Sequence, residues 1–243
     1  MLLFMAYKLD RSIYFVKNYF LLKIASQGKM LDRNYQTGLF IIIIYWRGMF
    51  MKTDKKQELI AIGAELMHLK GYNDTGVQEI LGKAGLPKGS FYNYFKSKED
   101  FGLLVVDYYM AFYNKIFAKF MDNKSVPPLE RIRRLYKSFN KSFRANHYTL
   151  GCPIGNFAQE LGDTSPVFQA RLKKSADTIV RYFSDVLREA QASGHLSRSL
   201  DADKTAHYIF NSWEGAIMSM KVEKSLRPLE INEQFLFDYI LKP

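Results

Sequence analysis

The stretch that decides the fold is TGVQEILGKAGLPKGSFYNYFKSK, residues 75–98. Thr75 and Gln78 have the spacing of a capping box, which predicts the start of a short helix. The sequence Ala84-Gly85-Leu86 breaks this helix, and Pro87 suits the first turn of another helix that runs to Phe95. Two short helices joined by a glycine-containing turn have the spacing of a helix-turn-helix.

The side chains of the second short helix suit a nucleic acid. The segment 87–98 contains three lysines and no acidic residue. Lysine and tyrosine side chains suit phosphate oxygens, whereas Ser90 and Asn93 can reach base edges in the major groove. Gly89 has no side chain, so it allows a close approach to the DNA backbone. The net charge of the whole chain is +11, which permits an acidic partner without choosing one.

The rest of the chain also shows helical periodicity. Apolar residues recur every three or four positions before Gly71, which predicts a helix there. Further helices are predicted over 98–121 with a Ser97 cap, from Pro128 to about 147, over 166–193, from a cap at Asp201 to about 220, and over 232–241. No alternating strand pattern occurs, so we predict an all-α fold. Residues 51–97 would form a three-helix helix-turn-helix domain, and 98–243 a larger helical effector-binding and dimerisation domain.

The motifs resemble a known family. They are Gly71-Tyr72, TGVQEI at 75–80 and AGLPKGSFYNYFKSKE at 84–99. This ordered string resembles the DNA-binding domain of TetR-family repressors from about Lys52 onward. The resemblance implies a cytoplasmic homodimer that binds a palindromic DNA operator and releases it when an effector binds the helical body. Gly76 departs from the pattern, because the family often has Ser or Thr there.

The resemblance also implies roles for individual side chains. The implied phosphate contacts are Thr75, Tyr94 and Lys98, and the implied base or groove contacts are Lys88, Ser90, Tyr92 and Asn93. Gln78 has two alternative roles: it could cap the helix backbone or contact DNA. Phe91 and Phe95 have the i, i+4 spacing of core residues.

A second set of motifs narrows the resemblance. They are GCPIGNF at 151–157, WEGA at 213–216 and KVEKSLRPLE at 221–230. They resemble the branch with N-ethylmaleimide-reductase repressors, which sense electrophiles or oxidants through a cysteine. Cys152 and Lys221 match the sensor cysteine and a nearby lysine. A helix N-terminus and this lysine would favour the thiolate. Without a second cysteine, sensing would use alkylation, sulfenic acid or its condensation with a nitrogen. The alternative is a buried, structural Cys152 and a non-covalent hydrophobic effector.

Other classes of function have less support. The single cysteine excludes an intramolecular disulfide, and four scattered histidines show no metal-ligand spacing, so we expect no metal or cofactor. Cys152 and His147 could pair as nucleophile and base, but no orienting acid or oxyanion-hole signature accompanies them. We therefore expect no catalytic residues and no enzyme activity.

Two long apolar stripes suggest the route of dimerisation. The resemblance places the last long helices in a four-helix interface between two subunits, although an internal core is the alternative. The stripe residues are Phe168, Leu172, Ile179, Phe183, Val186, Ile209, Trp213 and Met220.

Residues 1–50 differ in composition from the rest. They hold 11 of the 37 aromatic residues and no Glu or Pro. Ile, Phe, Tyr, Lys and Asn, whose codons are AT-rich, make up 22 of the 50, and Trp46-Arg47-Gly48 can encode a ribosome-binding sequence just before Met51. We interpret 1–50 as a mis-assigned start or disordered leader. The alternative is a peripheral membrane anchor, since basic and aromatic residues alternate there and the apolar runs are too short to span a bilayer.

Overall fold

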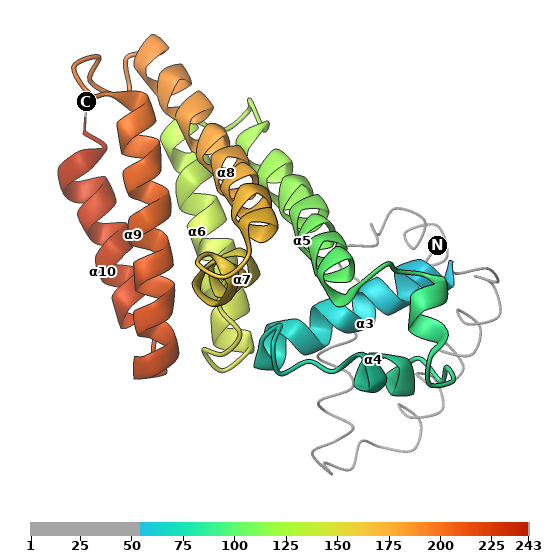
Figure 1. The fold of residues 1–243 in the computed structure, drawn as a ribbon. Helices are drawn as coiled ribbons and strands as arrows, with labels where there is room; N and C mark the ends of the chain where they lie inside the picture. The colour runs from blue at the N-terminus through green and yellow to red at the C-terminus, as the bar shows by residue number, and fades with distance from the viewer. Residues whose placement is uncertain (1–53, 243) are drawn as a thin grey trace, which may run out of the picture. The chain divides into compact units, whose positions relative to one another are not determined.

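The computed structural model describes residues 54–242, and the residues from Lys56 onward form one compact unit (Figure 1). The described residues are helical and contain no β-strand, so the predicted all-α fold is confirmed. The interpretations of residues 1–50 lie outside the described residues.

Within residues 54–242, the first three helical segments are α3 (Lys55–Lys70), α4 (Val77–Lys83) and the 3-10 turn η2 (Ser90–Asn93). The predicted helix from Pro87 to Phe95 is wrong in extent and type. Gly89 has a left-handed backbone with φ of +93°, so a regular helix cannot run through it from Pro87. The short η2 turn therefore begins only at Ser90.

The predicted cap at Thr75 is also wrong. Gly76 is the N-cap of α4 and offers no side chain to the free backbone N–H groups. The Thr75 hydroxyl instead donates a hydrogen bond to the carbonyl of Gly71 (2.6 Å), and the residue is fully buried. Thr75 thus secures the turn between α3 and α4, because its hydroxyl points back along the chain.

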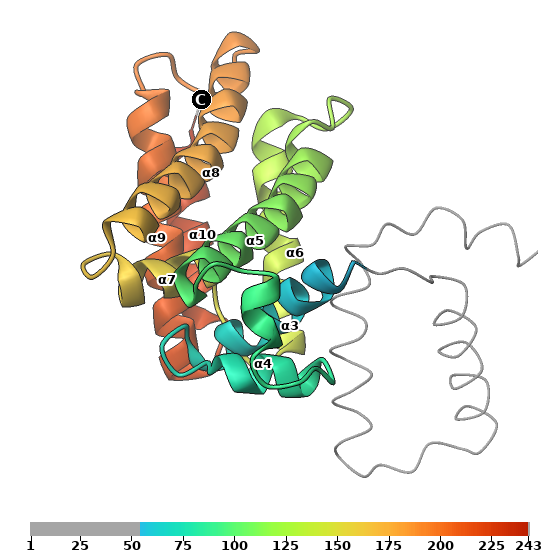
Figure 2. The same cartoon turned by 45° about the vertical axis from the view of Figure 1, so that its right-hand side comes forward.

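Six further helices form the body, which Figures 1 and 2 show as a bundle. They are α5 (Lys98–Met121), α6 (Pro128–Ala145), α7 (Pro153–Leu161), α8 (Pro166–Ala192), α9 (Ala202–Glu223) and α10 (Arg227–Phe235), followed by the π-helical turn η3 (Leu236–Ile240).

The predicted starts of the body helices are mostly confirmed. Ser97, Ser165 and Asp201 accept hydrogen bonds from backbone N–H groups as N-caps of α5, α8 and α9. The last helix begins earlier than the predicted Asn232. Pro228 lies in its first turn, where the missing N–H of proline costs nothing.

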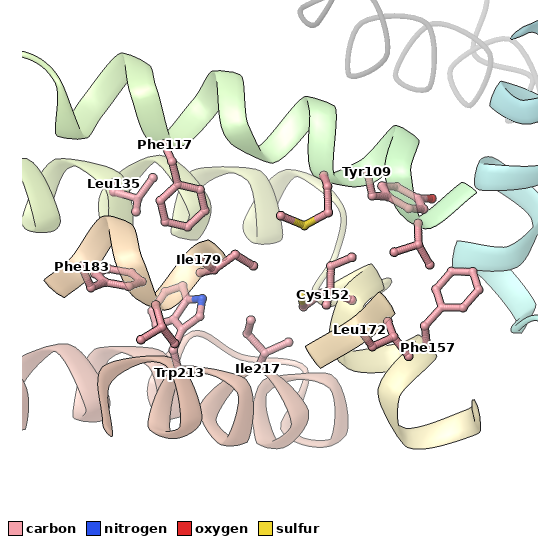
Figure 3. Close-up of a cluster of buried hydrophobic side chains, with 14 of the residues drawn as sticks. Tyr109, Phe117, Leu135, Cys152, Phe157, Leu172, Ile179, Phe183, Trp213 and Ile217 are labelled. Carbon is pink, nitrogen blue, oxygen red and sulfur yellow. The ribbon is translucent and has the colours of Figure 1, made fainter. Parts of the chain in front are cut away.

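The apolar stripes of α8 and α9 face each other within one chain. All eight residues proposed for the dimer interface are buried, including Phe183 at 3% exposed and Trp213 at 7%. Figure 3 shows these two side chains in the core between the helices, close to Ile179. Their assignment to a dimer interface is therefore wrong, because helical periodicity reveals an apolar face but not which element covers it.

Candidate DNA-binding surface and effector pocket

Most of the predicted DNA contacts lie at the surface of α4 and η2. Gln78, Lys88, Gly89, Tyr92 and Asn93 are exposed, and Tyr92 has 66% of its surface free. Behind them, Phe91 and Phe95 are buried as predicted, with ring centroids 4.9 Å apart. Phe101 of α5 packs against Phe95 at 4.7 Å. This aromatic cluster supports the exposed segment from below.

Three other predicted contacts are half-buried, namely Ser90, Tyr94 and Lys98. The hydroxyl of Ser90 donates to the carbonyl of Pro87 at 2.8 Å and so stabilises the turn that precedes η2. Thr75 is fully buried and its hydroxyl is engaged, so the geometry removes it from the set of candidate phosphate contacts.

The Lys98 side chain is held against the turn between α3 and α4. Its Nζ donates to the carbonyl of Asn73 at 3.2 Å and lies 4.6 Å from the ring centroid of Tyr72. Partial burial lowers the pKa of Lys98, and the nearby Glu160 carboxylate opposes this shift. The position of this ammonium group thus depends on the 72–73 backbone.

A pocket of about 200 Å³ lies between α7 and α9. It is lined by Cys152, Gly155, Asn156, Gln159, Glu214, Ile217, Met218, Lys221 and Val222. Figure 3 shows Cys152 where α7 begins, with Ile217 of α9 nearby. The two residues predicted to sense an effector, Cys152 and Lys221, therefore share one pocket.

Cys152 is the N-cap of α7, and its Sγ accepts from the N–H of Gly155 at 3.5 Å. The predicted thiolate is nevertheless wrong. Burial raises the pKa of Cys152 well above its usual value, and the negative charge of Glu214 raises it further. The Gly155 N–H and the Tyr113 hydroxyl, 3.9 Å from Sγ, lower it by less. The neutral thiol therefore dominates at neutral pH.

Sequence reasoning missed Glu214 as a pocket residue. Burial raises the pKa of its carboxyl, and the nearby Cys152 thiol opposes this shift. A Cβ atom at position 155 would overlap the Glu214 carboxyl, so this side chain would have to shift to admit it. An acidic residue directly beside the buried Trp213 was the available signal. The Nζ of Lys221 donates to Asn156 Oδ1 at 3.2 Å.

Sequence reasoning also missed two contacts, one from the loop before α7 to α3 and one from α7 to the turn after α3. His68 of α3 bonds through Nε2 to the carbonyl of Gly151 at 3.1 Å. Glu160 of α7 accepts from the backbone N–H groups of Tyr72 (2.8 Å) and Asn73 (2.6 Å). No local pattern signals these bonds, because their partners are more than 80 residues apart.

Two family models match the chain. One, described as "Bacterial regulatory proteins, tetR family", matches residues 59–102. The other, described as "Tetracyclin repressor-like, C-terminal domain", matches residues 128–236. Together the two matches cover more than half of the chain. The protein belongs to the TetR family.

Individual relatives agree with this family. Transcriptional regulator AcuR of Cereibacter sphaeroides is 38% identical over 172 residues, which are 71% of this chain and 78% of AcuR. The transcriptional repressor DhaR of Mycobacterium sp. strain GP1 is 32% identical, over 78% of this chain and 94% of DhaR. The crystal structure of Escherichia coli NemR in its reduced form has a TM-score of 0.71 and 27% identity, covering 79% of this chain and all of NemR's.

As a TetR-family protein, the chain is a DNA-binding transcriptional regulator and not an enzyme. Cys152 is buried, whereas His147 is exposed at the far end of the loop before α7. The structure therefore gives no geometric support to a nucleophile–base pair of Cys152 and His147. Among residues 54–242, no group of three His, Cys, Asp or Glu side chains could hold a metal ion. Within the same range, no helix is both long and apolar enough to cross a bilayer.

Proposed function

We propose that this TetR-family regulator is a homodimeric repressor that releases a palindromic operator when a small molecule reacts or binds in the pocket of Cys152. The proposed effector site rests on one observation: Cys152 and Lys221 line the same pocket. The division of labour follows the helices, with 51–97 contacting DNA and 98–243 holding the effector and the partner subunit.

The proposed binding of operator DNA rests on the exposed side chains around η2. Lys88, Tyr92 and Asn93 are exposed on an acid-free segment, so they can enter a major groove. Gln78 is exposed in the first turn of α4, and Gly89 keeps the approach open. Ser90, Tyr94 and Lys98 lie at the edge of this surface, where phosphates would run.

The proposed dimer rests on the outer faces of α9, α10 and η3, in place of the buried stripes. Large apolar side chains are exposed there, including Tyr239 at 66%, Ile231 and Phe235. Val222, which is 81% exposed, and Met218 lie between this face and the Cys152 pocket, which they also line. We propose that a second copy of the chain covers this face, since a homodimer presents two recognition segments about one DNA turn apart (~34 Å).

Sedimentation tests the dimer. Wild type should sediment as a dimer at micromolar concentration, and the double variant Ile231→Glu, Phe235→Glu should sediment as a monomer. Val167→Glu alters an exposed apolar residue of α8 outside this face and serves as the control. A monomeric wild type would refute the homodimer, and a dimeric double variant would refute this interface.

The proposed reaction of Cys152 with an effector does not require a thiolate in the unreacted protein. An electrophilic alkene such as a quinone can take up the Cys152 thiol: the S–C bond forms and the thiol proton ends on the adjacent carbon or oxygen. The Glu214 carboxyl lines the same pocket as Cys152 and can carry that proton. Similarity to reduced NemR supports membership of the electrophile-sensing branch, although AcuR and DhaR share more identity with this chain.

An operator-release assay separates covalent from non-covalent sensing. We expect a quinone to release labelled operator from wild type, Cys152→Ser to resist release, and Lys221→Ala to respond more weakly. Undiminished release from Cys152→Ser would leave Cys152 as packing and a non-covalent hydrophobic ligand as the inducer.

We propose a cytoplasmic location, because a repressor has to reach operator DNA on the chromosome. The alternative function, a peripheral membrane protein anchored by residues 1–50, predicts that the full chain binds anionic vesicles. We expect unchanged operator affinity when residues 1–50 are deleted. Loss of operator binding, or vesicle binding that requires these residues, would contradict the proposed role.

A further inference from the structure

Helix α7 and the loop before it are hydrogen-bonded to α3 and to the turn that follows α3. Gly151, two residues before its first turn, bonds through its carbonyl to His68 of α3 at 3.1 Å. Near its other end, the Glu160 carboxylate accepts two N–H groups, from Tyr72 at 2.8 Å and Asn73 at 2.6 Å. We call this pair of bonds the Glu160 clamp. The short helix is therefore fixed to the turn that connects α3 with α4.

The same helix forms one wall of the effector pocket. Gly155, Asn156 and Gln159 of α7 line the pocket, and Gln159 directly precedes Glu160. A nine-residue helix is roughly 13 Å long, and its backbone hydrogen bonds join the pocket wall and Glu160 in one continuous element. A change in the pocket that shifts α7 must therefore move the Glu160 carboxylate.

The loop before α7 is unusual in its backbone. His147, Tyr148 and Leu150 all have positive φ, between 53° and 71°, in addition to Gly151. Residues other than glycine adopt this conformation at a cost of order 1 kcal/mol each. Bonds from His68 to Gly151 and from Asn156 to the Leu150 carbonyl (2.8 Å) hold this loop in place.

The clamped turn in turn holds a candidate DNA contact. Asn73 donates its N–H to Glu160 and accepts from Lys98 Nζ at 3.2 Å through its carbonyl. The ring of Tyr72 lies beneath the same ammonium group at 4.6 Å. Glu160 also acts on Lys98 electrostatically, favouring its charged form. The path from pocket to DNA surface thus runs Gln159, Glu160, the 72–73 backbone and Lys98.

We propose that the Glu160 clamp transmits the state of the effector pocket to the DNA-binding helices. The proposal rests on the proposed function, in which this pocket takes the effector. When a pocket group displaces α7, the carboxylate withdraws from two backbone N–H groups that it satisfies by charge-assisted bonds. The 72–73 turn and Lys98 then lose the position that operator binding requires. Glu160 is a positioning residue, since it acts on DNA only through its neighbours.

Two independent changes to the pocket test this coupling. The first is N-ethylmaleimide, which can modify only Cys152 because the chain has a single cysteine. The second is Gly155→Ala, whose Cβ atom would overlap the Glu214 carboxylate and needs no ligand. Each change is applied to wild type, to Glu160→Gln and to Asp163→Asn, an exposed carboxylate of the following turn that serves as the matched control.

The readout is the Kd for an operator selected from random DNA by the wild-type chain, with random DNA as reference. Each pocket change should weaken operator binding at least about tenfold in wild type and in Asp163→Asn, but less than about twofold in Glu160→Gln. Equal weakening in all three backgrounds would overturn the proposal. So would unchanged operator affinity in wild type after both pocket changes.

The outcomes also separate this proposal from covalent sensing. Suppose that Gly155→Ala weakens operator binding in wild type but not in Glu160→Gln, and that N-ethylmaleimide has no effect. The coupling through Glu160 is then supported, and covalent sensing at Cys152 is refuted. Hydrogen exchange of the 72–74 amides in wild type gives a second measurement that does not depend on the Glu160 variant folding. A pocket change that weakens operator binding should speed this exchange about tenfold. Unchanged exchange would overturn the proposal.

Discussion

His68 should make the stability of the protein fall as the pH drops from about 7 to about 5. The imidazole of this α3 residue is largely buried against the loop before α7, and burial lowers its pKa from 6.5 to about 4. The positive charge of Lys221 lowers it further, while hydrogen bonds to the Gly151 and Leu150 carbonyls oppose the shift. The folded protein therefore keeps His68 neutral at a pH where the unfolded chain is protonated.

The sign and size follow from proton linkage. Below a pH of about 6.5 the unfolded state binds one more proton at this residue, so protonation favours unfolding. The loss continues until the pH reaches about 4, where the folded state also takes up the proton. Between about pH 7 and 5 the free energy of unfolding should fall by about 2 kcal/mol through His68 alone.

The assay is urea unfolding followed by circular dichroism at fixed protein concentration. The raised pKa values of Glu214 and Glu233 work in the opposite direction, because those carboxyls favour the folded state as the pH falls. The quantity to compare is therefore the pH-dependent change in wild type minus that in His68→Gln, whose amide can still donate to Gly151. His195→Gln, at an exposed histidine, is the control. An unchanged pH dependence in His68→Gln would refute the reasoning.

Three further predictions follow from other parts of the structure. Lys98→Ala should weaken binding to all DNA sequences and make the slope of log K against log salt shallower by about one; a change confined to the operator would contradict a phosphate contact. Asn93→Ala should cost ~1–3 kcal/mol of discrimination at one operator position, and equal losses on operator and random DNA would contradict base readout. Gly102→Ala would place a Cβ 2.7 Å from ring atoms of both Tyr72 and Phe168, so thermal unfolding should show a loss of ~1–3 kcal/mol; Gly215→Ala, which meets no atom within 4 Å, should show none.

Local patterns predicted the helices well where a polar cap or a proline marks the start. Ser97, Ser165 and Asp201 cap helices as predicted, because a side-chain oxygen next to free N–H groups acts within a single turn. The same logic failed at Thr75. The Thr75 hydroxyl could accept from the free N–H groups of α4 or donate to the Gly71 carbonyl. In the buried turn it donates to the Gly71 carbonyl.

The sequence alone determined the family, the all-α class and the acid-free segment 87–98, because these depend on residue types at fixed spacings along the chain. Only the tertiary structure decided which faces are covered. It placed the α8 and α9 stripes in an internal core, and it raised the pKa of Cys152 by burial and by the nearby Glu214. It also joined Glu160 to the 72–73 backbone. Burial, local dielectric and long-range hydrogen bonds depend on segments far apart in sequence, so no local pattern carries them.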